Sequence, residues 1–406
     1  MSTWLKEKNS DITIKYILFL FSPFFSFIYA LRRINTKSSY LTFFATAIFF
    51  GMSYTVPSGK SSEGGIDGQV YREFFENYKY VQYSEFIDNL MGFLSFNVGM
   101  KDYYFNTIAF YLSRVTDNYH VMFMVFAIIF AYFSLKTLKF LTEEDKFDLS
   151  IISYILLYLF LHNQIFNING VRFWTPAWIA LYSIFQIYRN NNNKYFLLAL
   201  LTPYFHGSYW IFIAVLILAR FLMRFEKIWI IFFITSYFIS IFSLALIEYV
   251  QPYLPNFLVN LTNSYTSTEA ISRRENITIY KTIFSNLTTF YINFIIILFI
   301  KNSKEIRKNI KTKNLYLFLL VWSSTFNFFM AIPSLGNRFI ELSYPIIAYI
   351  WLINFKNKKY DYVILALPLV FANSIREQII YYNMTLSTGF YFSSPFYLIY
   401  KHILSL

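Results

Sequence analysis

The chain contains no cysteine, and its four histidines are spread thinly over 406 residues. The absence of cysteine excludes disulfide bonds and thiolate metal sites, and so few histidines do not suggest a metal cluster. Charged residues make up only 14% of the chain, against about 25% in an average soluble domain. Glycine-rich phosphate loops, a nucleophile elbow and an Asp-x-Asp pair are missing too, so ATP-driven transport and soluble nucleotide-sugar chemistry have no support.

Long apolar runs are what the chain has in abundance, and apolar residues make up 57% of it. A run of about 20 apolar residues can cross a bilayer as a helix, whereas barrel strands would alternate over about ten residues. The sequence therefore predicts one all-α domain over residues 1–406, a polytopic integral membrane protein with about 11–12 transmembrane helices. Pro203 and His206-Gly207-Ser208 interrupt residues 195–223, which predicts a broken helix or a short hairpin there.

The basic residues predict an orientation. Of the 35 lysines and arginines, 20 fall into six short loops, at residues 32–39, 136–148, 189–194, 220–227, 301–314 and 356–360. Basic loops stay on the cytoplasmic side of a membrane, so these loops are expected inside. Two long segments are then external: residues 57–118, expected to carry amphipathic interfacial helices, and residues 250–281. The net charge of +13 belongs mainly to the loops, so no nucleic-acid partner is expected.

Two arginines at expected outer helix ends are the strongest candidates for chemistry. Arg172 follows Asn169-Gly170-Val171, and Arg338 follows Gly336-Asn337. A buried arginine in a membrane is costly and usually marks a site, and its planar fork suits phosphate oxygens. Each has a plainer interpretation: Arg172 can snorkel to the interface, and Arg338 can pair with Glu341 three residues on.

Three further groups have weaker signals. Asp67, in Gly65-Ile66-Asp67-Gly68, can orient or deprotonate a hydroxyl, or simply cap a helix over Tyr71–Tyr78. His206 can relay a proton or donate to a phosphate, or satisfy backbone carbonyls at the break. Arg273-Arg274-Glu275 in the second external segment can close over a pyrophosphate, or be ordinary solvated loop charge.

Taken together, these motifs resemble the EpsG/Wzy-like family of bacterial surface-polysaccharide polymerases. The matching pieces fall between about residues 60 and 355: Gly65-Ile66-Asp67-Gly68 with Tyr71, Asn169-Gly170-Val171-Arg172, Phe205-His206-Gly207-Ser208, and Asn337-Arg338 leading into Tyr344-Pro345. One departure is that the family usually places glutamine after the arginine of the second motif, where this chain has Phe173. A role that needs that amide is therefore not expected.

The resemblance implies a multi-pass enzyme of the bacterial inner membrane that serves O-antigen, capsule or exopolysaccharide synthesis. Such an enzyme transfers a growing glycan from undecaprenyl pyrophosphate to a lipid-linked repeat unit at the periplasmic face. The implied partners are undecaprenyl-pyrophosphate-linked oligosaccharides, membrane lipids and a chain-length regulator protein. A pyrophosphate leaves as an anion, so the reaction needs cationic stabilisation, and neither a metal nor another cofactor is expected.

The predicted site combines three sets of residues. The expected catalytic residues are Asp67, His206, Arg172 and Arg338. The pyrophosphate is expected to bind Arg172, Arg338, Arg274 and Arg273. The sugars are expected to bind Tyr71, Arg72, Glu275 and Glu341. Three other functions are considered. An O-antigen ligase-type glycosyltransferase would differ in its acceptor, and a lipid-linked oligosaccharide flippase should show repeat symmetry. The third is a structural scaffold. The mechanism requires Arg172 and Arg338 to meet in one pocket.

Overall fold

The computed structural model describes residues 4–56, 67–96, 102–163, 168–254, 259, 262–263, 279–332, 335–358, 360–386 and 388–404. Within these ranges the regular structure is helical, apart from an isolated bridge between Tyr54 and Leu386. The all-α class predicted from the sequence is confirmed.

The helices follow one another with short connections. The first part of the chain forms α1 (Asn9–Phe21), α2 (Pro23–Ala30), η1 (Leu31–Arg33), α3 (Lys37–Ser53), α4 (Asp67–Tyr78), α5 (Tyr83–Leu94), α6 (Tyr104–Leu112) and α7 (Tyr119–Thr142). The middle part forms α8 (Ile151–Phe160), η2 (Ile168–Gly170), α9 (Val171–Ile184), η3 (Phe185–Arg189), α10 (Tyr195–Ala199), α11 (Thr202–Phe205), α12 (Tyr209–Leu222), α13 (Glu226–Ser236), η4 (Phe238–Ile241), α14 (Phe242–Val250) and η5 (Gln251–Tyr253). The last part forms α17 (Ile279–Lys301), α18 (Ser303–Lys308), α19 (Ile310–Phe328), η6 (Phe329–Ala331), α20 (Gly336–Glu341), α21 (Ser343–Asn354), α22 (Asp361–Leu365), α23 (Leu367–Val370), α24 (Ala372–Thr385), α25 (Gly389–Phe392), α26 (Pro395–Ile399) and η7 (Tyr400–Leu404).

Polar caps set where several of these helices begin. The Thr36 hydroxyl accepts the N–H of Ser39 at the start of α3. Asn118 caps α7 and Asn309 caps α19 in the same way, each through its side-chain oxygen. Such a cap satisfies a backbone donor that the first turn of a helix leaves without an intrahelical partner.

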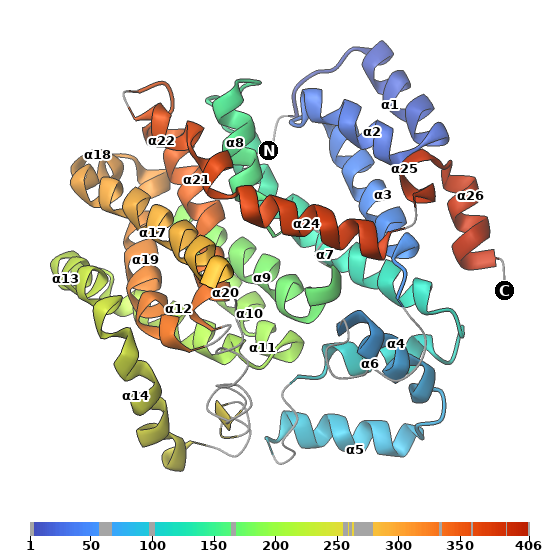
Figure 1. Cartoon of the computed structure of the whole chain (residues 1–406), viewed down its shortest axis with the longest axis horizontal. Coiled ribbons are helices and arrows are strands. Elements are labelled where there is room, and N and C mark those ends of the chain that lie inside the picture. The colour runs from blue at the N-terminus through green and yellow to red at the C-terminus, as the bar shows by residue number, and fades with distance from the viewer. Residues whose placement is uncertain are drawn as a thin grey trace.

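The core forms around α9 and α21. In α9 every residue is buried except Arg172 and Tyr182, and α21 is buried along its whole length. Helix α7 packs against both α3 and α9, while α21 packs against α8 and α19. Figure 1 shows α9 near the middle of the molecule, with α4, α5 and α6 together at the lower right and α18 and α22 at the upper left.

A buried ion cluster ties several core helices together beyond the end of α7. Glu144 accepts hydrogen bonds from Arg189 (2.6 Å), Lys311 (2.7 Å) and the Tyr349 hydroxyl (2.7 Å). These partners belong to η3, α19 and α21. We call these four residues the Glu144 cluster.

The outer surface of the helices is apolar. Along α12, α13, η4 and α14 the exposed side chains include Ile217, Phe221, Ile228, Ile231, Ile234, Phe238, Ile241 and Phe242. Contiguous exposed hydrocarbon is unfavourable in water and is typical of a surface that meets lipid or a partner. Together with the apolar helices, this surface identifies a membrane protein.

By length and composition, two helical stretches in the described part are each sufficient to cross a membrane, Tyr119–Thr142 and Ile310–Ala331. Two bent pairs bring the number to four if each is one span: Glu226–Ser236 with Phe238–Tyr253, bent by 67°, and Asp361–Val370 with Ala372–Tyr381, bent by 43°. The predicted total of about 11–12 spans is therefore not confirmed and stays a prediction.

The break predicted within residues 195–223 is present. Helix α11 ends at Phe205, His206 is in an extended conformation, and α12 begins at Tyr209. Of the two segments predicted to be external, 57–118 contains α4, α5 and α6, and most of 250–281 lies outside the described residues.

Candidate active site

A polar cavity of about 420 Å³ lies where α4, η2, α9 and α20 meet the break before α12. It is lined by Asp67, Val70, Tyr71, Asn169, Gly170, Arg172, Phe173, Trp174, His206, Arg338 and Glu341. The structure thus brings Arg172 and Arg338 to one cavity, although 166 positions separate them in the sequence. Asp67 and His206 line the same cavity.

Arg172 lies in the first turn of α9 and is held by an ion pair. Its Nη2 lies 2.5 Å from Oδ2 of Asp102, whose side chain is only 3% exposed, while that of Arg172 is 35% exposed. Arg172 Nε is buried and has no hydrogen-bond partner among the described residues. The guanidinium is therefore anchored on one side and still has donors for a ligand oxygen at a helix N-terminus, which also favours anions.

Asp102, the ion-pair partner of Arg172, is a residue that the sequence analysis did not single out. The N–H of the next residue, Tyr103, donates to the Tyr204 carbonyl at 2.9 Å, which fixes this segment against α11. Asp102 lies 70 residues before Arg172 in the chain, so no local spacing connects them. The only signal was a carboxylate just before an apolar helical stretch.

Arg338 is exposed at the second position after Gly336 in α20. Its Cζ lies 5.3 Å from the centroid of the Phe173 ring, a cation–π contact. Neither Glu341 nor any other described residue forms an ion pair with Arg338, so the structural pair considered as an alternative is not formed. A Cβ atom on Gly336 would lie 2.6 Å from the Met330 Cα, so this turn requires a glycine.

Phe173, the departure from the family pattern, connects two members of the site. Its ring contacts the His206 ring at 5.4 Å between centroids and the Phe339 ring at 5.3 Å, besides supporting Arg338. Where an amide would offer hydrogen bonds, this chain offers an apolar ring face and edge.

His206 is oriented by Ser208. The Ser208 N–H donates to Nδ1 of His206 at 3.3 Å, and the Ser208 hydroxyl lies 2.8 Å from the same nitrogen. Because Nδ1 accepts a backbone N–H, the proton of the neutral ring is assigned to Nε2. The break in the helix therefore fixes both the ring and its tautomer.

Asp67 is the first residue of α4, where a carboxylate interacts favourably with the helix dipole. It also lines the cavity, so the helix-terminal and the functional interpretations are compatible. The adjacent Gly68 N–H donates to Oδ1 of Asn169 at 2.6 Å. Asn169 thus ties the start of α4 to the turn that precedes Arg172.

The other predicted residues divide into three groups. Tyr71 and Glu341 line the cavity, and burial raises the pKa of the Tyr71 hydroxyl, so it stays protonated as a donor. Arg72 does not line it: Nε donates to Glu76 at 2.8 Å and Nη1 to the Val56 carbonyl at 3.0 Å. Arg273, Arg274 and Glu275 lie outside the described residues.

The cavity contains both basic and acidic side chains. It contains two guanidinium groups, from Arg172 and Arg338, and two carboxyl groups, from Asp67 and Glu341. A ligand that carries both a phosphate and a hydroxyl would satisfy both kinds of group. In the part of the chain that the structure describes, no three His, Asp or Glu side chains are placed to hold a metal ion.

Comparison with curated proteins gives no match, and neither does comparison with solved structures. The sequence model of the EpsG family matches residues 44–384, a range that includes every residue lining the cavity. Because this range covers well over half of the chain, the protein belongs to the EpsG family.

Proposed function

We propose that this membrane protein is a polysaccharide polymerase, an inverting glycosyltransferase. It would transfer a growing glycan from undecaprenyl pyrophosphate to a lipid-linked oligosaccharide repeat unit. The observation that carries the proposal is the single cavity shared by Arg172, Arg338, Asp67 and His206. Family membership supports the polymerase-type activity.

In this reaction an acceptor hydroxyl oxygen attacks the anomeric carbon, and the bond from that carbon to the pyrophosphate oxygen breaks. A single displacement inverts the anomeric configuration. Charge develops on the departing pyrophosphate, and the guanidinium groups of Arg172 and Arg338 stabilise it in a partly water-excluded cavity. No proton has to reach the leaving group, because pyrophosphate departs as an anion.

The acceptor proton needs a base on the other side of the reacting carbon. Asp67 and His206 are the leading candidates, since each lines the cavity and each can accept a proton. The Tyr71 hydroxyl and the Glu341 carboxyl group are placed to bind sugar hydroxyls. A general base must come within about 2.6–3.2 Å of the proton-bearing oxygen. In the tautomer that Ser208 favours, Nε2 of His206 already carries a proton, so His206 can accept another at Nε2 only after that proton moves to Nδ1, whereas Asp67 needs no such change.

The proposed setting is the bacterial inner membrane, which the chain crosses several times, with the cavity open to the periplasm. Support comes from the basic loops. Helix α18 carries Lys304, Arg307 and Lys308 and lies far from α4, α5 and α6 (Figure 1). Basic loops favour the cytoplasmic side, so the cavity beside α4 is assigned to the opposite face.

The test is reconstitution of the purified protein with an undecaprenyl-pyrophosphate-linked repeat unit. We expect a ladder of longer glycans and released lipid pyrophosphate. Arg172→Ala and Arg338→Ala should leave only the single lipid-linked unit, and Arg172→Lys should retain part of the activity, because lysine binds phosphate as a point charge. Arg224→Ala, which removes an exposed arginine that does not line the cavity, is the matched control.

Other outcomes would overturn the proposal. Normal ladders from both alanine variants would remove the pyrophosphate role of the arginines. Transfer to a lipid A acceptor without a ladder would favour an O-antigen ligase-type enzyme. Movement of the lipid-linked unit across a liposome membrane without glycan growth would favour a flippase.

A further inference from the structure

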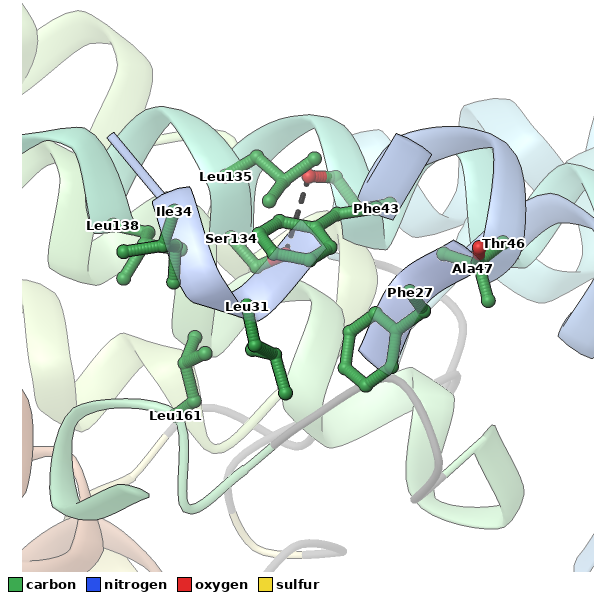
Figure 2. A pocket seen from close by; sticks show the side chains of 11 residues that line it. Phe27, Leu31, Ile34, Phe43, Thr46, Ala47, Ser134, Leu135, Leu138 and Leu161 are labelled. Carbon is green, nitrogen blue, oxygen red and sulfur yellow. Dashed lines mark hydrogen bonds between the residues drawn. The ribbon is translucent and has the colours of Figure 1, made fainter. Parts of the chain in front are cut away.

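Two cavities lie beside the α2–η1 segment, the polar one near the start of α3 and the apolar one against Phe43, Thr46 and Ala47 of the same helix. Residues 31–34 divide between them: Leu31 and Ile34 line an apolar cavity, while Arg32 and Arg33 line a polar one of about 320 Å³. Figure 2 shows that the side chains around the apolar cavity are hydrocarbon except for Thr46 and Ser134. The Ser134 hydroxyl is already bonded to the Ala131 carbonyl at 3.1 Å, so it adds little polarity.

The linings of the two cavities alternate along the α2–η1 segment: Tyr29, Arg32 and Arg33 line the polar cavity, whereas Phe27, Leu31 and Ile34 line the apolar one. The two cavities therefore lie on two faces of one short segment. On the α8 segment Tyr154 lines the polar cavity and Leu161 the apolar one, and seven residues of helix correspond to about 10 Å, so the apolar cavity lies further along α8. The Tyr154 hydroxyl donates to the Leu31 carbonyl at 3.3 Å and joins the two elements at the boundary.

The cations of the polar cavity are not equivalent. The buried Lys15 ammonium donates to Thr36 at 3.1 Å, Ser38 at 2.8 Å and Ser39 at 2.7 Å, and it also pairs with Glu7. Its hydrogen-bonding capacity is therefore used within the protein.

Two arginines complete this cavity. Arg33 Nη1 lies 3.1 Å from Asp11 Oδ2. Arg32 is exposed, its Cζ lies 5.4 Å from the Tyr29 ring centroid, and it has no ion-pair partner among the described residues. One cation therefore remains for an external anion, next to an apolar cavity.

The length of α3 indicates where the polar cavity lies relative to the membrane. Its 17 residues, Lys37–Ser53, correspond to about 25 Å of helix, close to the roughly 30 Å of a bilayer core. Just past its far end the Tyr54 hydroxyl donates to Oδ1 of Asn169, which lines the arginine cavity, at 3.5 Å. In Figure 1, α3 runs from the α1–α2 pair toward α4. The polar cavity therefore opens at the membrane surface opposite the arginine cavity.

We propose that these two cavities together bind one anionic phospholipid of the leaflet opposite the arginine cavity. The lipid phosphate would contact Arg32, with Tyr29 and Arg33 beside it. The apolar cavity, about 80 Å³ in volume, takes a short stretch of one acyl chain, and the rest of the chain stays in the bilayer. The basic loops predict that this leaflet is the cytoplasmic one, where negative lipid headgroups attract arginine and lysine. This site shares no lining residue with the arginine cavity and does not depend on the polymerase function.

The experiment is native mass spectrometry of the full-length protein titrated with phosphatidylglycerol or phosphatidylcholine. We expect one retained phosphatidylglycerol and weaker binding of phosphatidylcholine. Arg32→Gln should weaken phosphatidylglycerol binding about tenfold, as expected for the loss of one charge-assisted contact. Ala47→Leu, which fills the apolar cavity, should weaken the binding of the same lipid with its charge contacts intact.

Arg224→Gln is the matched control, because Arg224 is also exposed and its Cζ lies 4.8 Å from the Phe225 ring centroid. The control should bind phosphatidylglycerol as the unmodified chain does. Equal losses in Arg32→Gln and Arg224→Gln would show a nonspecific charge effect and overturn the site. Equal binding of the two lipids by the unmodified chain would overturn it as well.

Discussion

Replacing Asp102 with asparagine should slow glycan transfer without removing any group proposed to touch the pyrophosphate. Asp102 is almost fully buried and holds Arg172 Nη2 at 2.5 Å. Asparagine keeps the shape and one acceptor oxygen but removes the negative charge. The guanidinium then keeps a neutral acceptor but loses the charge that fixes its direction into the cavity, so we expect Asp102 to act as a positioning residue and not as a catalytic one.

The size of the effect follows from the exposure of the pair. A hydrogen bond to a charged group contributes about 1.5–3 kcal/mol, and solvent screening at a partly exposed guanidinium favours the lower value. A loss of about 1.5–2 kcal/mol corresponds to a rate roughly 10–30 times lower. Arg172→Ala removes two such contacts with a phosphate, and about 3–6 kcal/mol corresponds to a rate roughly 10²–10⁴ times lower.

The assay is the initial rate of lipid-pyrophosphate release in a double-mutant cycle. Because Asp102 acts only through Arg172, the double variant Asp102→Asn with Arg172→Ala should be no slower than Arg172→Ala alone. Asp102→Glu should recover part of the rate by restoring the charge. Circular dichroism and thermal unfolding check that each variant is folded. Losses that simply add in the double variant, or an unchanged rate in Asp102→Asn, would refute the positioning role.

Three other substitutions test separate parts of the structure. Phe173→Ala removes the ring under Arg338, a contact of about 0.5–1 kcal/mol, and should raise the KM for the lipid-linked donor several-fold; an unchanged KM would contradict the contact. Gly336→Ala forces a Cβ to within 2.6 Å of Met330 Cα and should lower the midpoint of thermal unfolding through strain of about 1–3 kcal/mol; a wild-type midpoint would show that the turn relaxes freely. Glu144→Gln should destabilise the protein by about 1.5–3 kcal/mol, since Arg189 keeps only Glu143 as a carboxylate partner and the half-exposed Lys311 loses its own. Burial alone would raise the pKa of Glu144, but hydrogen bonds from its three partners lower it. The stabilisation that ionised Glu144 contributes to the fold is therefore complete above the ordinary pKa of about 4.3 and is lost as the pH falls through the lowered pKa. Thermal unfolding against pH should show a smaller acid-side loss in Glu144→Gln than in the unmodified chain, because Asp148, whose pKa is also lowered, still contributes in both.

The sequence predicted what depends on long periodic signals and on unusual residues. Extended apolar runs predicted the helical class, which the structure confirms, and four short motifs predicted the family, which the match over residues 44–384 confirms. Arg172 and Arg338 could be singled out because a cation at an otherwise apolar helix end has a high energetic cost.

Features that depend on tertiary contacts could not be predicted. Asp102 acquires its role from a contact 70 residues away, which no local pattern encodes. Arg72 is different, because its partner Glu76 is four residues on, a spacing that predicts a helical ion pair from sequence alone. Helix lengths were predicted less well: hydropathy does not register breaks such as the 67° bend between Glu226–Ser236 and Phe238–Tyr253, which lies inside one apolar run.

One side-chain amide, that of Asn169, has a consequence for specificity. Its Oδ1 accepts a hydrogen bond from the Gly68 N–H, next to Asp67, and Asn169 lies three residues before Arg172. Asn169 therefore connects the side of the cavity that carries the Asp67 carboxylate to the side that carries the Arg172 guanidinium. This hydrogen bond couples the start of α4, which carries Asp67, to the turn before Arg172, so we expect the two sides of the cavity to move together when a ligand binds. We therefore expect relatives that act on other sugars to differ at Val70 and Trp174, which also line the cavity.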